Sequence, residues 1–231
     1  IADPAHRAAH ADAFQALARR ALMHIRLFAL LLLLSLFPGG VRAIEEPAYV
    51  VVSRHADFEV RAYAGYVVAE VLVAGSRDAA DRDGFRLLFR YISGANRRSQ
   101  SMAMTAPVTT TEVRAGESVE IPMTAPVARI AEVGGHRVQF VLPAGYTVAS
   151  APEPIDPRVQ LREIAPMQVA VIRYSGSWSA RNEQRHLRQL EAGVASAGLK
   201  VIGAPVLSRF NAPYVPSFFR RNEIWLPVAS G

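Results

Sequence analysis

The order of local sequence patterns repeats once along this chain, and the repetition constrains the fold more than any other feature. Two strand-like segments and an amphipathic helical segment occupy residues 58–92, and the same order returns over residues 159–197. A shift of 101 residues aligns like residues at matching points, such as Arg61 with Arg162. We infer an internal duplication, and two such units side by side predict an α+β fold with two helices packed on a mainly antiparallel sheet. The pseudo-repeats span about residues 47–145 and 158–228.

Runs rich in Val, Tyr and Ala between Gly and Pro breaks predict the strands, and a helical spacing of apolar positions predicts the helices. In the first unit Phe85, Leu88, Phe89 and Ile92 follow the i, i+3, i+4, i+7 pattern, and Gly94 ends the helix. The first unit has strands at residues 49–53, 58–63, 66–73, 101–110, 118–130 and 137–142 and a helix at 78–92; the second has strands at 159–164, 168–174, 206–211 and 222–227 and a helix at 180–197.

Residues 23–43 have the parts of a secretory signal peptide. A basic start precedes an apolar run of eleven residues at 27–37, and small residues precede a cleavage site near Ile44. Because this run is well below the roughly 20 residues that span a bilayer as a helix, we expect cleavage, a periplasmic or secreted protein and no integral membrane span afterwards. An uncleaved anchor is the lesser alternative. Residues 1–22 are interpreted as a non-native upstream extension, which leaves 44–231 as a single domain.

Composition excludes several classes of function. The chain has no cysteine, which rules out disulfides, thiolate nucleophiles, iron–sulfur clusters and thiolate ligation of haem. Beyond residue 43 the charge falls to 21 basic against 18 acidic residues, which is too little to predict a nucleic-acid-binding surface. The histidines of that region, His55, His136 and His186, are scattered and form no metal-binding motif. A P-loop, a dinucleotide fingerprint and a nucleophile elbow are also absent from the sequence.

The pentapeptide Met-Thr-Ala-Pro-Val occurs at residues 104–108 and again at 123–127, each time at the end of a strand-like run. Its proline suits the end or edge of a strand because proline donates no hydrogen bond to the ladder. Together with Tyr-Ile-Ser-Gly-Ala-Asn at 91–96 and Arg-Arg-Asn-Glu-Ile-Trp at 220–225, the motif resembles the SOUL family of haem-binding proteins over about residues 46–228. The resemblance implies a distorted β-barrel flanked by helices, of the SOUL and GyrI-like architecture, and binding of haem or another tetrapyrrole.

The first helix carries the candidate ligand site. Arg82, Arg86 and Arg90 recur every four residues along one flank, beside Phe85 and Phe89. Such a surface offers apolar area to a macrocycle and guanidinium groups to its two carboxylates. The alternative is an ordinary surface helix whose arginines reach into water while both phenylalanines are buried.

The resemblance also implies that the segment with the first pentapeptide flanks the ligand, which adds Met102 and Met104 as pocket walls. Alternation along a half-buried strand would equally explain these two methionines. Some family members carry a histidine, proposed as an axial ligand, where this chain has Ala62 within Glu59–Tyr63. The resemblance therefore implies haem or porphyrin binding without a protein axial ligand.

Taken together, these features predict a non-enzymatic protein that binds haem or a related tetrapyrrole in an apolar groove on the first helix, for carriage, buffering or scavenging. One alternative is a small-molecule-binding or hydrolytic GyrI-like domain, for which Glu70 and Glu163 are the strand carboxylates to nominate. Another is an envelope module whose groove takes a peptide or a partner helix. The arginines and Glu223 of residues 220–223 are interpreted as cross-strand pairs that fix the closing strand.

Overall fold

Nine strands form one curled sheet, and apart from one extra edge strand their order is symmetric about a central pair. The computed structural model describes residues 44–98 and 117–230, and residues 44–231 form one compact unit. All pairs in the nine-stranded sheet are antiparallel, in the order β1-β2-β9-β11-β10-β5-β6-β3-β8. The strands are β1 (Tyr49–Arg54), β2 (Glu59–Tyr63), β3 (Tyr66–Ala74), β5 (Val127–Glu132), β6 (Gly135–Val141), β8 (Gln160–Ile164), β9 (Met167–Tyr174), β10 (Val206–Arg209) and β11 (Asn222–Val228).

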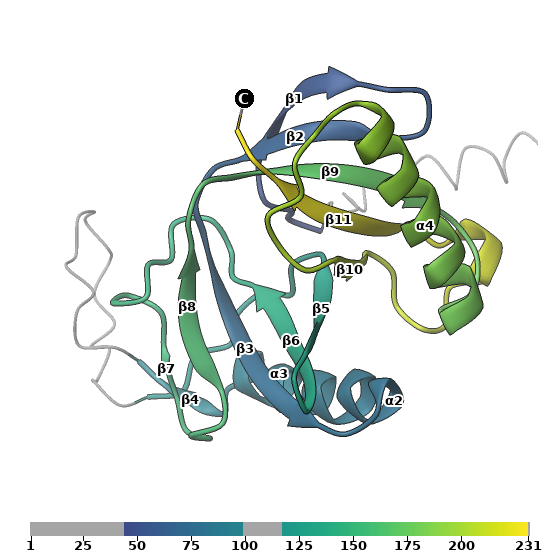
Figure 1. The fold of residues 1–231 in the computed structure, drawn as a ribbon. Coiled ribbons are helices and arrows are strands. Elements are labelled where there is room, and N and C mark those ends of the chain that lie inside the picture. The colour runs from purple at the N-terminus through teal and green to yellow at the C-terminus, as the bar shows by residue number, and fades with distance from the viewer. Residues whose placement is uncertain (1–43, 99–116, 231) are drawn as a thin grey trace, which may run out of the picture. The chain divides into compact units, whose positions relative to one another are not determined.

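The symmetry of this order places corresponding strands of the two predicted units at matching distances from the central pair, β10 and β5. The strands that the 101-residue shift aligns exchange partners between the units, because β2 pairs with β9 and β8 pairs with β3. The units are therefore interlocked, and each half of the sheet carries its own helix (Figure 1). This arrangement agrees with the α+β fold expected from the sequence, a curled half-barrel with two flanking helices.

The first helical run lies on β3 and β6, and its middle is irregular. It consists of α2 (Arg77–Ala79), a π-helical turn η1 (Ala80–Gly84) and α3 (Phe85–Ile92). Ser76 caps its start by accepting the amide of Ala79, and Gly94, with φ +106°, follows its end. A Cβ on Gly84 would lie 2.6 Å from the Val138 Cγ2 atom, so glycine lets the π turn approach β6 closely.

The second helix, α4 (Ala180–Ser196), lies on β9 and β11 and covers the other half of the sheet. Ser179 caps it by accepting the amide of Asn182. One core cluster lies under each helix, around Leu88 for the first and Leu190 for the second. A third cluster around Trp225 fills the opposite face of the sheet, because successive residues of a strand point to opposite faces.

The Arg-Arg-Asn-Glu segment at the start of β11 has the structural role expected of it. Glu223 is fully buried, and its carboxylate lies 2.9 Å from Arg61 and 2.8 Å from Arg221. Arg61 belongs to β2 and Glu223 to β11, so the ion pair crosses β9 and joins the two strands on either side of it. The predicted cross-strand pairing is confirmed for Glu223 alone, because Arg221 bonds Glu223 within the same segment and Arg220 bonds the backbone carbonyls of Val215 and Pro213.

The strand predicted at 118–130 is wrong over most of its length. Residues 117–126 are irregular, with isolated bridges at Glu120 and Thr124, and the strand β5 begins only at Val127. Pro122 and Pro126 lack the amide that a ladder requires, and the Ala125–Pro126 bond is cis. The second pentapeptide therefore opens a strand instead of closing one.

Two short strands were not expected from the sequence: β4 (Asn96–Arg97) pairs with β7 (Glu153–Pro154), which belongs to the proline-rich passage between the units. The first pentapeptide, Met102, Met104, the strand predicted at 101–110, the leader and residues 1–22 lie outside the described residues.

Candidate ligand-binding cleft

A cleft of about 560 Å³ lies over the central strands, on the face of the sheet that carries the helices. This volume is within the range of roughly 300–1,000 Å³ that is common for small-molecule sites. The first helical run and the segment after β10 form two of its walls. The lining comprises Asp81, Arg82, Phe85 and Phe89 from the helical run, Val127, Arg129, Val138, Leu207 and Arg209 from the strands, and Ile44, Met123, Thr124, Ala125, Trp178 and residues 210–214 from the connecting segments.

Phe85 and Phe89 form an apolar wall of this cleft. Their rings stack with centroids 5.8 Å apart and planes at 11°, and Phe85 also meets the buried Phe140 edge-on at 5.3 Å. The two residues stay 36% and 48% exposed, whereas Leu88 and Ile92 are buried in the core. The helical pattern thus correctly predicted that Leu88 and Ile92 face the core, and the alternative in which both phenylalanines are buried is wrong.

The three arginines of the predicted cationic flank do not share one environment. Arg82 lines the cleft, whereas Arg86 and Arg90 do not. Arg82 is 70% exposed at its side chain and lies 3.5 Å from Asp83, and Arg86 lies 3.2 Å from the same carboxylate. The π turn changes the residue spacing at Arg82, so the line assumed from regular α-helical geometry breaks there.

A cluster of largely buried ion pairs borders the cleft, and in it two carboxylates each contact the same two guanidinium groups. Asp81 of η1 lies 3.0 Å from Arg129 and 2.7 Å from Arg209, and Glu183 of α4 lies 3.0 Å and 3.3 Å from the same two arginines. We call these four residues the charge square. Because Arg129 belongs to β5 and Arg209 to β10, the square joins both helices to the central strand pair.

A fifth charge, Arg77, extends the charge square. Its guanidinium lies 2.9 Å from Glu183, and although burial opposes protonation, that carboxylate raises the pKa of Arg77. Burial lowers the pKa of Arg129, and the charges of Asp81 and Glu183 offset part of this effect. Arg77 also lies 3.4 Å from the exposed Asp78, so the three cations of the cluster contact three carboxylates.

Sequence patterns alone did not reveal the charge square, although a signal for it exists. Asp81 and Glu183 are 102 residues apart, close to the 101-residue shift of the duplication, so they occupy similar places in the two helices. Arg129 and Arg209 are 80 residues apart because the connections before these strands differ in length. An alignment of both units that allowed for such gaps would have matched Asp81 with Glu183 and Arg129 with Arg209.

None of the histidines at 55, 136 and 186 lines the cleft. His55 stacks on Phe58 at 4.3 Å and His186 on Tyr174 at 4.1 Å. Among the residues lining the cleft, the thioether of Met123 and the phenol of Tyr214 are the groups with known haem-ligand chemistry. Within the described ranges no group of three or more His, Asp or Glu side chains could hold a metal ion.

The two strand carboxylates nominated for catalysis point to opposite faces of the sheet. Glu70 faces Gln160 in the ladder, and Glu163 faces Val67, which packs in the core under the first helix. Glu70 is buried and bonded to Arg137, Arg162 and Gln139. These contacts give Glu70 a structural role, and the geometry does not bring the pair together as an acid and a base.

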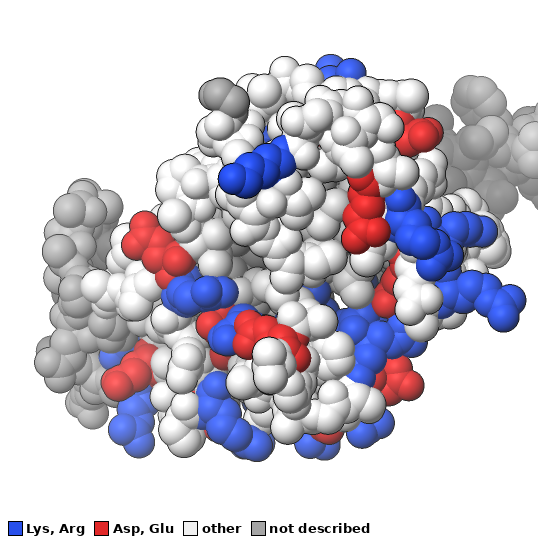
Figure 2. Space-filling view, in the orientation of Figure 1, with Lys and Arg blue, Asp and Glu red and all other residues white. Residues whose placement is uncertain are grey.

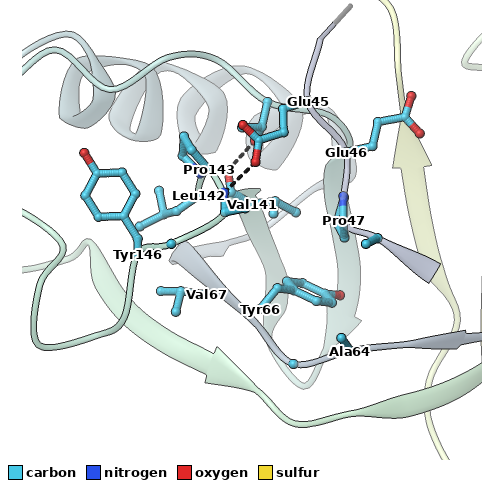
Figure 3. A pocket seen from close by; sticks show the side chains of 15 residues that line it. Glu45, Glu46, Pro47, Ala64, Tyr66, Val67, Val141, Leu142, Pro143 and Tyr146 are labelled. Carbon is cyan, nitrogen blue, oxygen red and sulfur yellow. Dashed lines mark hydrogen bonds between the residues drawn. The ribbon is translucent and has the colours of Figure 1, made fainter.

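A second pocket, of about 290 Å³, lies between residues 45–48, the start of β3 and residues 141–146 (Figure 3). Tyr66, Pro47 and Pro143 line it, and the Glu45 carboxylate accepts the backbone amide of Ala144. Glu45 and Glu46 are its charged residues, and its lining contains no Lys or Arg. This pocket is therefore electrostatically unsuited to a ligand with carboxylates.

In the described part of the chain, no helix is long and apolar enough to cross a membrane.

Residues 44–227 match the SOUL heme-binding protein family. Human heme-binding protein 2 is 30% identical over 152 residues, which cover 64% of this chain and 66% of that protein, just under two thirds of its length. Among solved structures, the EcmrR C-terminal domain has a TM-score of 0.48 at 10% identity, over 80% of this chain and 99% of that one. A hydrolase from Listeria innocua has a TM-score of 0.44 at 10% identity, over 82% and 94%.

Proposed function

Because the chain belongs to the SOUL heme-binding protein family, we propose that it holds haem or a related tetrapyrrole in the cleft beside the first helix, without catalysing a reaction. The observation that carries this proposal is the stacked pair of Phe85 and Phe89, which faces the cleft and remains partly exposed. Aromatic side chains that the described residues leave partly uncovered offer a suitable face for a flat apolar guest.

The remaining lining suits such a guest in its polarity. Val127, Val138 and Leu207 give the floor an apolar surface, and Met123 adds a flexible side chain that adapts to an aromatic ligand. Pockets that combine apolar walls with few polar groups are typical of small-molecule sites. Haem iron would add redox chemistry, whereas binding and orientation depend on these side chains.

We assign a carboxylate of the ligand to Arg82. Arg129 and Arg209 also line the cleft, but both guanidinium groups are already paired within the charge square. Arg82 is mostly exposed, and its nearest carboxylate lies 3.5 Å away, so it can turn toward an anionic group at the rim. The sequence pattern suggested Arg82, Arg86 and Arg90 for this role. We keep Arg82 and place Arg86 and Arg90 outside the site, because neither lines the cleft.

We also propose that no protein side chain coordinates the iron. Coordination by Met123 or Tyr214, which line the cleft, would contradict this. Similar affinities for hemin and for iron-free protoporphyrin are expected if contacts alone hold the ring. Carriage, buffering or scavenging outside the cytoplasm would suit such reversible binding.

Amino-terminal sequencing of the exported protein tests the leader, and the expected first residue is near Ile44.

A titration followed in the Soret band tests the site. Residues 44–231 should bind hemin saturably, and Phe85→Ala/Phe89→Ala should weaken binding about tenfold or more because apolar contact area is lost. Arg82→Gln should weaken it about tenfold, whereas Arg90→Gln, the matched control, should not. No saturable change below an order of 10 μM, or equal effects of Arg82→Gln and Arg90→Gln, would refute this site.

A further inference from the structure

Three aromatic side chains on one short segment after β10 are largely exposed to solvent. Tyr214, Phe218 and Phe219 are 88%, 69% and 72% exposed, and the last two rings touch with centroids 4.5 Å apart. The 3-10 turn η2 (Ser217–Phe219) lies at the outer edge of the molecule (Figure 1). We call residues 213–219 the aromatic tip. Exposed aromatic groups clustered in this way are unfavourable in water and typical of an interaction site.

The backbone of the aromatic tip is held in one conformation by hydrogen bonds. The Arg220 guanidinium donates to the carbonyls of Val215 at 2.7 Å and Pro213 at 2.6 Å. The amide of Phe219 donates to the Pro216 carbonyl, and the amide of Gly176 donates to that of Ser217. The tip therefore presents its rings without further ordering, which lowers the entropic cost of inserting them into a partner.

A band of arginines lies beside the aromatic tip. Asn182 on α4 bonds the carbonyls of Ser175 and Ser177, on either side of the Gly176 that contacts the tip. On the same helix Arg181, Arg185 and Arg188 follow the i, i+4, i+7 spacing of one face, and all three are exposed. None of them has an ion-pair partner among the described residues. Figure 2 shows basic side chains gathered on the side of the molecule where α4 lies.

We propose that the aromatic tip and the arginine band dock the protein on an anionic lipid bilayer. The apolar rings of Phe218 and Phe219 favour the boundary between headgroups and acyl chains, and the phenol of Tyr214 suits the interfacial layer. Arginines without an ion-pair partner favour the negative surface of the membrane. A stable protein partner would need about 800 Å² of surface on each side, which three side chains at an edge do not supply. Tyr214 also lines the cleft, so docking would bring the cleft mouth to the lipid surface, where apolar ligands collect.

Sedimentation with lipid vesicles tests this inference. Residues 44–231 are the suitable chain, because they form a compact unit and lack the apolar run at 27–37, which would itself bind lipid. Vesicles containing phosphatidylglycerol should bind the protein roughly tenfold more strongly than pure phosphatidylcholine vesicles, and binding should weaken at high salt. Phe218→Ser/Phe219→Ser and Arg181→Gln/Arg185→Gln should each reduce binding roughly tenfold. Val133→Ser, at a fully exposed apolar residue in the β5–β6 turn, should leave it unchanged.

Three outcomes would overturn the inference: no vesicle binding by the unaltered chain, binding unaffected by the phenylalanine variant, or a dimer in sedimentation equilibrium that only this variant dissociates. The last result would identify the tip as a contact between copies of the chain. Circular dichroism checks that the variants stay folded. The Soret titration without lipid is a separate measurement, so failure of lipid docking and failure of ligand binding are distinguishable.

Discussion

Removing one carboxylate from the charge square should strongly destabilise the fold. Glu183 is 6% exposed and contacts Arg77, Arg129 and Arg209 at 2.9, 3.0 and 3.3 Å. Glu183→Gln keeps the size of the side chain but leaves Arg129 and Arg209 with the single carboxylate of Asp81, and Arg77 with the exposed Asp78 alone. Removing one partner of a buried ion pair typically costs about 3–5 kcal/mol, because the remaining charge stays desolvated. We expect a loss within that range, a large share of the roughly 5–15 kcal/mol that stabilise a typical domain.

Urea unfolding followed by tryptophan fluorescence measures this loss. Trp178 lines the cleft near the charge square and Trp225 is buried in the sheet, so fluorescence reports on both regions. The midpoint should fall while the slope against urea stays constant, which separates a change in stability from a change in the unfolded state. Glu191→Gln, at an exposed position of the same helix, is the matched control and should cost no more than about 0.5 kcal/mol.

The other carboxylate of the square gives an internal comparison. The side chain of Asp81 is 23% exposed, against 9% for Glu183, and it contacts two guanidinium groups instead of three. Asp81→Asn should therefore cost less than Glu183→Gln, because water compensates part of the lost interaction. A cost below about 1 kcal/mol for Glu183→Gln, or the reverse order of the two variants, would refute the reasoning.

Two further expectations concern packing and pH. Gly84→Ala places a Cβ 2.6 Å from Val138 and should lower the free energy of unfolding in urea by about 1–3 kcal/mol. Val138→Ala in the same chain should recover part of that loss. A Gly84→Ala variant with unchanged stability would contradict the close approach. Burial raises the pKa of Tyr66 from 10 to about 12, so between these values the unfolded chain releases its proton first and the free energy of unfolding falls as pH rises. Tyr66→Phe should reduce that fall, by at most about 1.4 kcal/mol per pH unit, and an unchanged pH profile would count against the shift.

Local periodicity was sufficient to predict most elements and the apolar part of the site. The spacing of Phe85, Leu88, Phe89 and Ile92 separates core from rim on a single helix, and this depends only on residues within two turns of each other. The repeated strand and helix order likewise predicted two helices on one antiparallel sheet. These features follow from local patterns and need no knowledge of long-range register.

Features that depend on register between distant segments could not be predicted in this way. The charge square needs β5 beside β10, and Leu207 faces Arg129 only because the two units meet at these strands. The π turn that separates Arg82 from Arg86 reflects the fit of Gly84 against Val138 of another strand. The irregular path of residues 117–126 shows the same limit, because apolar composition predicted a strand where prolines prevent the ladder.

The central claim is that the cleft beside the first helix receives a flat tetrapyrrole, and NMR of methyl groups tests it most directly. Iron-free protoporphyrin added to residues 44–231 should shift the methyl signals of Met123, Val127 and Leu207 through the ring current of the bound macrocycle. Signals of Val60 and Leu190, in the core under α4, should remain in place. Saturable binding that leaves the cleft methyl signals unchanged, or that shifts Val67 and Leu142 of the smaller pocket instead, would contradict the account.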